Sequence, residues 1–173
     1  VIYAASKGAA DLFCLAAASC HGQDIVITRA SANYGPRQDA GQLVPTFVHA
    51  AFHDQALPIP GNGMQIRDWI HVDDHCRGML AAFQKGQPGA VYLLGGQCER
   101  TTLGIARSIL EIMGKPSSLV THVPETPDND ERHAVDFSKA MAGLDWKPRE
   151  RFRDSFPLVV REIAANLHDS AVS

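Results

Sequence analysis

Residues 21–36 read HGQDIVITRASANYGP, and this stretch decides the fold class of the chain. Residues 24–29 are a short run rich in β-branched side chains, which predicts a buried strand of the parallel type. The polar residues 31–36 follow it, and we expect them to form a loop. Ligands of open α/β sheets bind at the carboxyl ends of strands, so a functional site is expected at this loop.

Helical and extended patterns alternate on both sides of this stretch. Residues 3–21 are rich in Ala, Leu and Phe and contain no Pro, which predicts a long helix that ends at Gly22. Further helices are expected over residues 43–53, 73–85, 102–113, 138–144 and 152–167, and extended segments over residues 57–60, 65–72, 91–94 and 119–123. Asp73 and Thr101 are the expected N-terminal caps of the helices that begin beside them. This alternation indicates an α/β protein.

Composition narrows the class of protein. The 173 residues are 45% hydrophobic and 20% charged, with a formal net charge of −3 and no block of basic residues, which argues against nucleic-acid and membrane partners. No apolar run of transmembrane length or signal peptide is present. The four cysteines form no Cys-x-x-Cys pair, so we expect reduced thiols and a cytoplasmic protein.

Tyr3 and Lys7 are four residues apart, so they share one face of the first predicted helix. A phenol has a pKa of about 10 and is a poor base near neutral pH, but a nearby ammonium group stabilises the phenolate and lowers that pKa. Such a tyrosine can exchange a proton with a substrate hydroxyl while a hydride moves to a cofactor. Taken alone, such a pair is much more often a solvated pair on a helix surface than a catalytic pair, so its meaning depends on the rest of the chain.

The motifs that follow this pair occur in a characteristic order. They are Thr28-Arg29, Asn33-Tyr34-Gly35-Pro36, Pro58-Ile59 before Gly61-Asn62-Gly63, RDWIHVDD at residues 67–74, Tyr92 with Gly95-Gly96, and LDWKP at residues 144–148. This order resembles the C-terminal half of the extended short-chain dehydrogenase family of NAD-dependent epimerases and dehydratases, over essentially all 173 residues. Within the family, the strongest resemblance is to the dTDP-glucose 4,6-dehydratases. It implies the last part of a Rossmann-type sheet with a small mixed α/β substrate-binding lobe.

The resemblance also implies roles for individual residues. Tyr3 would be the catalytic base, Lys7 its partner and a ligand of the NAD ribose, and Asn33 would lie beside the nicotinamide and the substrate. Arg67 would bind the diphosphate of a nucleotide-sugar, which suits a guanidinium because it binds phosphate oxygens in a fork. The other implied substrate-binding positions are Gln42, Leu43, Pro58, Ile59, Thr102 and Arg132.

Several positions depart from the dehydratase pattern. Ala32, Gln42, Pro60 and Thr102 stand where family dehydratases carry Asn, Lys, Tyr and Asn. Their RPGHDRRY segment corresponds here to residues 126–133, of which only Pro127, Asp130 and Arg132 are retained. Phosphate-binding and base-binding groups are therefore missing, and Arg37 or Arg132 is expected to compensate.

The chain opens Val1-Ile2-Tyr3 without an initiator Met, and we expect it to be the C-terminal portion of a longer protein. The family's Gly-rich phosphate loop and its Asp-Glu pair, which eliminates water, would precede Val1. In the complete protein the resemblance implies oxidation at C4 of a nucleotide-activated hexose, loss of water across C5–C6, and reduction at C6. We expect this chain alone neither to hold NAD tightly nor to turn over.

Several alternatives stay open at this point. The complete protein could be a related epimerase or decarboxylase, the chain could be a non-catalytic sugar-nucleotide-binding or dimerisation module, or a separate chain could supply the N-terminal half. The apolar stripe of the first helix (Ala9, Leu12, Phe13, Ala16, Ala17) would be a homodimer face, or it would be buried against the chain's own sheet or the N-terminal half. His49 and His53 have a zinc-ligand spacing but lack a third ligand, so no metal site is expected.

Overall fold

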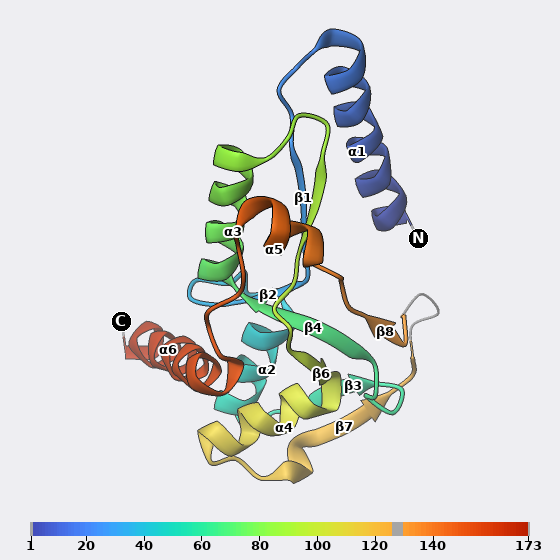
Figure 1. Cartoon of the computed structure of the whole chain (residues 1–173). Coiled ribbons are helices and arrows are strands. Elements are labelled where there is room, and N and C mark those ends of the chain that lie inside the picture. Colours follow the sequence, from blue (N-terminus) through green and yellow to red (C-terminus); the bar gives the residue numbers. More distant parts are fainter. Residues whose placement is uncertain (1, 126–129, 173) are drawn as a thin grey trace.

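The computed structural model describes residues 2–125 and 130–172, with side chains described as far as residue 168. Its elements form two parts (Figure 1). The first, called here the β1–β5 layer, contains α1 (Ile2–His21), β1 (Ile27–Ala30), α3 (Val72–Lys85), β5 (Val91–Leu94) and α5 (Ser138–Leu144). The second, called the lobe, contains β2 (Ala32–Tyr34), α2 (Leu43–Phe52), β3 (Leu57–Pro60), β4 (Ile66–His71), β6 (Glu99–Thr101), α4 (Thr102–Met113), a 3-10 turn (Ser117–Leu119), β7 (Val120–Val123), β8 (Arg132–His133) and α6 (Phe152–Val172).

The β1–β5 layer is built on two parallel strands. β1 and β5 are in register from Ile27 opposite Val91 to Ala30 opposite Leu94, which confirms the predicted parallel strand. α3 and α5 pack against this pair, and Figure 1 shows α1 on the other side of it. A small core joins these elements to β4: Ile70, Ala82, Tyr92, Leu94, Ala140, Leu144 and Trp146.

β4 is the central strand of the lobe. Its residues 69–71 pair in parallel with β2, and its residues 66–68 pair antiparallel with β6, while β8 pairs with residues 66 and 67. β3 pairs in parallel with β7. The extended segments on either side of residues 61–63 are therefore both strands, but they belong to different sheets.

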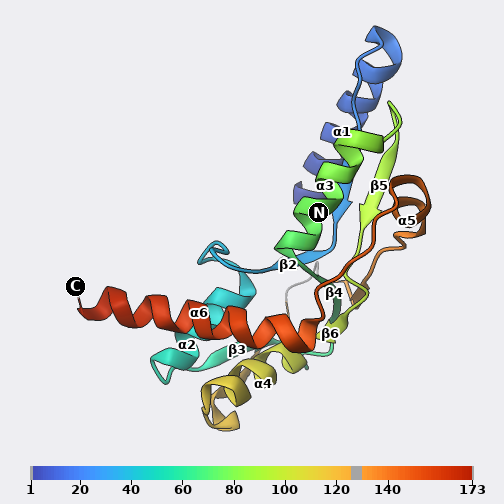
Figure 2. The same cartoon turned by 60° about the vertical axis from the view of Figure 1, so that its left-hand side comes forward.

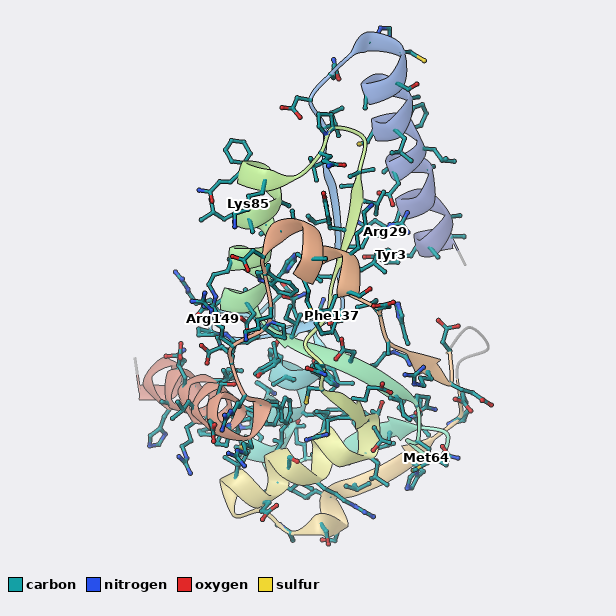
Figure 3. All side chains as sticks on the ribbon, in the orientation of Figure 1. Tyr3, Arg29, Met64, Lys85, Phe137 and Arg149 are labelled. Carbon is teal, nitrogen blue, oxygen red and sulfur yellow. The ribbon has the colours of Figure 1, made fainter. Side chains whose placement is uncertain are left out.

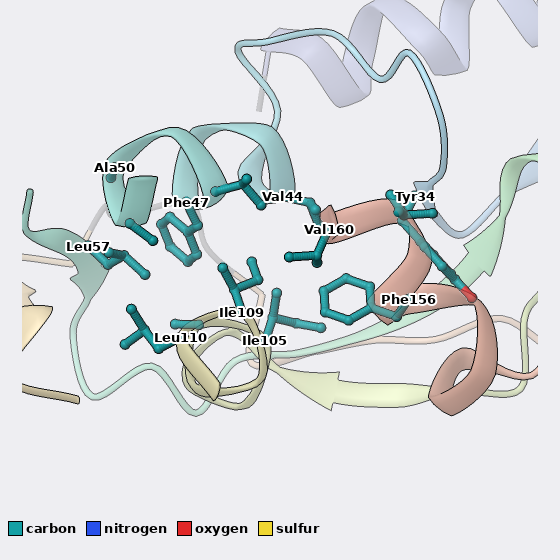
Figure 4. Close-up of a cluster of buried hydrophobic side chains, with 14 of the residues drawn as sticks. Tyr34, Val44, Phe47, Ala50, Leu57, Ile105, Ile109, Leu110, Phe156 and Val160 are labelled. Atoms are coloured by element: carbon teal, nitrogen blue, oxygen red, sulfur yellow. The ribbon is translucent and has the colours of Figure 1, made fainter. Parts of the chain in front are cut away.

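Three helices close the larger core beneath this sheet. α2, α4 and α6 pack against one another, and Figure 2 shows α6 lying across α2 beside β3 and α4. Figure 4 shows their apolar side chains interdigitating. The largest fully buried members are Tyr34, Leu57, Ile59, Ile105, Ile109 and Phe156. All five helices predicted after residue 22 are present, and α6 extends beyond the predicted end at residue 167 to Val172.

Helix ends follow local chemistry, with one correction. At α4 the Oγ1 of Thr101 accepts a hydrogen bond from the Gly104 amide at 3.0 Å, which confirms the predicted cap, and Gly114 ends the helix with a φ of 64°. At α3 the predicted Asp73 cap is wrong, because β4 extends to His71 and the His71 Nδ1 accepts from the Asp73 amide at 3.2 Å. Asp73 lies instead in the first turn, where a carboxylate interacts favourably with the helix dipole.

The loop predicted for residues 31–36 is also partly wrong, because Ala32–Tyr34 form β2. Asn33 stands opposite Ile70 and Tyr34 opposite His71 in the parallel ladder with β4. A segment of only three residues is too short to carry a clear strand signal of its own, so pairing with β4 decides its conformation. This pairing fixes the residues at the carboxyl end of β1 that were expected to bear function.

α1 contributes no buried residue to either core. Its Asp11 carboxylate pairs with Arg29 on β1, and Leu15 on the same face is half-buried. Leu12 and Phe13 remain 69% and 78% exposed. Burial of these two residues against the chain's own sheet is therefore ruled out. None of the described helices combines the length and the apolar character needed to cross a bilayer.

Candidate nucleotide-sugar site

A cavity of about 290 Å³ opens in the lobe where β2, β4 and β6 meet the starts of α2 and α4. Its walls are formed by Ala32, Asn33, Gln38, Gln42, Leu43, Pro60, Arg67, Trp69, Arg100 and Thr102. The set includes five of the predicted substrate-binding residues, which come from four different elements and the loop before α2. Pairing of β2 and β6 on the two sides of β4 is what brings them together.

Arginine side chains provide the positive charge of this cavity. The Arg67 guanidinium donates to the carbonyl oxygens of Ile66 and Asp130, each at 2.8 Å. Arg100 lies directly opposite Arg67 in the antiparallel ladder of β4 and β6. Residues opposite each other in such a ladder project from the same face of the sheet, so both cations line one wall.

Asn33 is held in a fixed orientation beside the cavity. Its Nδ2 donates to the Ser31 carbonyl at 3.0 Å, and its Oδ1 lies 2.9 Å from the Nδ1 of His75 on α3. An amide oxygen only accepts, so the His75 Nδ1 must be the donor. Burial lowers the pKa of His75, which favours the neutral ring near pH 7. Gln38 reinforces this strand by donating to the Asn33 carbonyl at 2.9 Å.

Two polar atoms on the cavity wall are buried without a hydrogen-bond partner among the described residues. They are the Nε1 of Trp69, whose residue is 6% exposed, and the Oε1 of Gln38. A buried polar atom left unpaired costs free energy; an acceptor atom of a ligand would satisfy the Trp69 N–H, and a donor would satisfy the Gln38 oxygen. These atoms therefore indicate a polar ligand.

Three predicted substrate residues lie away from the cavity wall. Ile59 is fully buried in the lobe core, and Pro58 is exposed on the opposite face of β3, whereas their neighbour Pro60 does line the cavity. Arg132 is exposed, and its guanidinium forms a two-pronged ion pair with the Glu99 carboxylate at 2.7 Å, which lowers the pKa of Glu99. Of the two other retained residues of this segment, Asp130 accepts from Arg67 through its carbonyl, and Pro127 lies outside the described residues.

Tyr3 and Lys7 are placed together on the exposed surface of α1. The Lys7 Nζ lies 5.5 Å from the centroid of the Tyr3 ring, and Tyr3 is 74% exposed. The Asp11–Arg29 pair anchors the middle of α1 to β1. The N-terminal end of α1 points toward the end of β1 that leads into β2, as Figures 1 and 2 show. Figure 3 shows Tyr3 and Arg29 on this side of the molecule.

The sequence argument did not identify Arg100 or His75 as site residues. Arg100 was missed because no strand was predicted over residues 99–101, although the alternation of Glu99, Arg100 and Thr101 would place Arg100 on one face of an extended segment.

Arg37, a proposed compensating cation, lines a separate cavity beside α2 and α6. His49 and His53 have ring centroids 4.6 Å apart, and within the described part of the chain no three His, Cys, Asp or Glu side chains are grouped to hold a metal ion.

Relatives of known activity resemble this chain over nearly its whole length. A dTDP-glucose 4,6-dehydratase from an Actinoplanes species is 42% identical over 164 residues, which cover 95% of this chain and 51% of the relative. The corresponding protein of Streptomyces niveus is 41% identical over 152 residues, covering 88% of this chain and 45% of the relative. The chain thus spans about half the length of the curated relatives it matches.

Solved structures extend the likeness to the fold. A Streptomyces venezuelae dTDP-glucose 4,6-dehydratase with NAD and TYD bound superposes with a TM-score of 0.92 at 35% identity, covering 95% of this chain and 51% of that one. A UDP-glucose 4-epimerase from Thermotoga maritima, with UDP-glucose, superposes with a TM-score of 0.89 at 25% identity, covering 95% and 54%. The expected α/β fold, a partial Rossmann-type sheet with a small lobe, is therefore confirmed.

The family assignment completes this comparison. The model of the NAD dependent epimerase/dehydratase family matches residues 1–95, more than half of the chain, including α1 with Tyr3 and Lys7, and β1 to β5. The matched segment also contains Asn33 and Arg67. The chain belongs to the NAD dependent epimerase/dehydratase family.

Proposed function

We propose that this chain supplies the sugar-nucleotide pocket and the Tyr-Lys pair of an NAD-dependent nucleotide-sugar 4,6-dehydratase. The observation that carries this proposal is the cavity of the lobe. It brings Asn33, Gln42, Leu43, Arg67 and Thr102 together, and these are positions that the family resemblance assigns to substrate binding. The dTDP-glucose 4,6-dehydratases among the similar proteins favour a thymidine nucleotide of glucose.

The cavity wall suits a ligand with a charged middle and an apolar end. Arg67 offers a guanidinium fork to phosphate oxygens. Thr102 is the first residue of α4, where the helix dipole favours an anion. Leu43 and Pro60 supply apolar surface on which a nucleotide base can rest. Gln42 adds an uncharged amide where family dehydratases carry a lysine.

Tyr3 and Lys7 suit the nicotinamide end of NAD. Both side chains are exposed on α1, so a cofactor and a sugar can reach them. The Lys7 Nζ lies 5.5 Å from the centroid of the Tyr3 ring, so an ammonium group is close to the side chain proposed to exchange a proton with a sugar hydroxyl. When bound, NAD supplies the acceptor and donor of hydride. Asn33, held by His75 and Ser31, has an amide of fixed orientation.

The phosphates of NAD need groups that these 173 residues do not carry. Gly61 to Gly63 and Gly95 to Gly96 are the glycine-rich turns, and neither opens a helix after a first strand in the Gly-x-Gly-x-x-Gly pattern. We therefore propose that NAD is held jointly with an N-terminal half, on the same chain or on a separate one.

Association through α1 is the second part of the proposal. The exposed apolar stripe of α1, which includes Leu12 and Phe13, is proposed to pack against a second copy of the chain.

The four cysteines are free thiols in the structure, as is typical of a reducing compartment, so we propose that the protein works in the cytoplasm.

A sugar-nucleotide-binding module without catalysis is the second candidate function. It is favoured by one observation, that all residues of the cavity wall belong to the lobe of this chain. On this alternative the pocket binds its ligand with no contribution from NAD. A related epimerase is the third candidate, favoured by the likeness to the UDP-glucose 4-epimerase.

Calorimetric titration of the chain tests the proposed function. We expect dTDP-glucose and TDP to bind more tightly than UDP-glucose, and Arg67→Gln to weaken binding about tenfold or more, because it removes a charge-assisted contact. Arg107→Gln, an exposed arginine on α4 outside the cavity, is the matched control and should bind normally. Preference for UDP-glucose would favour the epimerase, and no binding of any nucleotide-sugar would overturn the assignment of the cavity.

A further inference from the structure

We propose that Arg100 is a second diphosphate-binding residue, which together with Arg67 forms a two-arginine clamp across β4 and β6. The proposal rests on the proposed function, because it concerns the same cavity. It assigns the positive charge that the chain lacks at Gln42, where family dehydratases carry a lysine. It also assigns a ligand contact to a residue outside the set implied by the resemblance.

The strand register is the first support for the clamp. Arg67 and Arg100 are direct partners in the antiparallel ladder, and side chains at such positions lie about 5 Å apart at Cβ. Like charges directly opposite each other destabilise a sheet. An anion that enters beside them can therefore contact both guanidinium groups.

The contacts of Arg100 leave its charge available. One guanidinium nitrogen donates to the Glu99 carbonyl at 2.9 Å, and the guanidinium carbon lies 5.4 Å from the centroid of the Phe152 ring. Neither contact neutralises the cation, and no carboxylate pairs with Arg100 among the described residues. The side chain of the adjacent Glu99 forms an ion pair with Arg132. The acidic residue of β6 is therefore paired with a cation other than Arg100.

Trp69 adds an independent indication of a ligand. It follows Arg67 by two residues on β4, so both side chains project from the same face of that strand. Trp69 is 6% exposed, its Nε1 is buried without a partner among the described residues, and it lines the same cavity as the two arginines and Asn33. A diphosphate presents acceptor oxygens in several directions, which suits one indole donor and two guanidinium groups.

The neighbouring cations favour Arg100 over the residues expected to compensate. Arg132 is committed to Glu99, and Arg37 lines another cavity. Arg100, in contrast, lines both the proposed site and an adjoining cavity of about 590 Å³. Four further cations line that second cavity, with Glu150 as its single acidic residue: Lys147, Arg149, Arg151 and Arg153. The positive field of these groups would attract an anion toward Arg100.

Binding of TDP and thymidine to the purified chain tests the clamp. Arg100→Gln is compared with Arg153→Gln, which removes the same charge from the adjoining cavity alone. We expect Arg100→Gln to weaken TDP about tenfold or more and thymidine less than threefold, because only TDP carries the anion. Arg153→Gln should change TDP affinity less than threefold. Arg100→Lys, which keeps the charge but loses the fork, should fall between wild type and Arg100→Gln.

Thermal unfolding of the same proteins separates binding from folding. Removing one of two opposed cations should leave the Tm of the free chain unchanged or higher, while the rise in Tm caused by TDP should shrink. If wild type binds TDP and Arg100→Gln binds it equally well, the clamp is wrong and the proposed function stands. If wild type binds neither TDP nor dTDP-glucose, both are wrong. If Arg100→Gln loses thymidine and TDP alike, or lowers the Tm of the free chain, Arg100 is structural and the clamp is again wrong.

Discussion

Tyr34 shows how a single side chain connects β2 to the rest of the lobe. Its side chain is 1% exposed, its hydroxyl lies 2.8 Å from the Ser155 Oγ on α6, and its ring meets His71 and Phe156 edge-on. Burial raises the pKa of Tyr34 to about 12, because the phenolate would lose its hydration. The residue next to Asn33 is therefore a neutral phenol that anchors the site strand to α6.

This shift predicts a loss of stability in alkali. Below about pH 10 the phenol is neutral in both the folded and the unfolded chain, so it contributes no pH dependence. Between about pH 10 and about pH 12 the unfolded chain releases the proton and the folded chain keeps it, so the free energy of unfolding falls as the pH rises. Urea unfolding followed by circular dichroism over this range should show a steeper fall for wild type than for Tyr34→Phe. Identical slopes would contradict the shift.

The site residues illustrate what a sequence can predict at this scale. Asn33, Arg67 and Thr102 were identified by a family resemblance, and no local pattern would have grouped them, because they are far apart in the chain. Trp69, which lies in the motif at residues 67–74, is both buried and on the cavity wall. Its unpaired Nε1 is a property of the packed structure, so no sequence pattern reveals it.

At the scale of elements, Asp74 joins α3 to the segment between α5 and α6. Its carboxylate is 1% exposed, forms an ion pair with Arg77, and accepts hydrogen bonds from the amides of Arg149 and Glu150, each at 2.8 Å. Its carbonyl accepts from the Trp146 indole at 3.1 Å. One buried carboxylate thus fixes the chain that leads into α6, and through α6 the floor of the lobe.

Replacing this carboxylate should destabilise the whole chain. Asp74→Asn puts an amide N–H against a backbone donor and leaves Arg77 with only the Glu150 carboxylate at 4.0 Å, which should lower the free energy of unfolding by roughly 3 kcal/mol. Asp73→Asn is the matched control, because the neighbouring Asp73 side chain is 65% exposed, and its effect should stay within about 0.5 kcal/mol. Urea unfolding measures both, and equal effects of the two variants would show that Asp74 does not hold these elements together.

Elements were predictable where local chemistry decides them. The cap at Thr101 correctly predicted the start of α4, and all five helices expected after residue 22 are present. β2 and β6 were missed, because each has only three residues and forms by pairing with β4. These two strands carry Asn33 and Arg100 into the cavity, so the elements least visible in the sequence are the ones that build the site.

At the scale of the whole molecule, the two parts differ in how their apolar surface is covered. In the lobe, α2, α4 and α6 bury one another around a large core. In the β1–β5 layer, α1 buries no residue, and Phe83 on α3 is 87% exposed. Exposed apolar side chains that cluster on one helix face are typical of an interface. This asymmetry supports the proposal that α1 meets a partner, whether a second copy or an N-terminal half.

The proposed homodimer predicts that the α1 stripe, and not apolar exposure in general, drives association. Leu12→Ser with Phe13→Ser should shift the purified chain from dimer to monomer in size-exclusion chromatography with light scattering, with an unchanged Tm, because neither side chain is buried within the chain. Phe83→Ser makes the same chemical change on α3 and should leave the dimer intact. If wild type is monomeric, or if Phe83→Ser dissociates the dimer as well as the α1 variant does, α1 is not the homodimer face. If the chain is a folded monomer, the apolar stripe of α1 is expected to pack against the proposed N-terminal half. Adding that half should then protect the amides of α1 from hydrogen exchange.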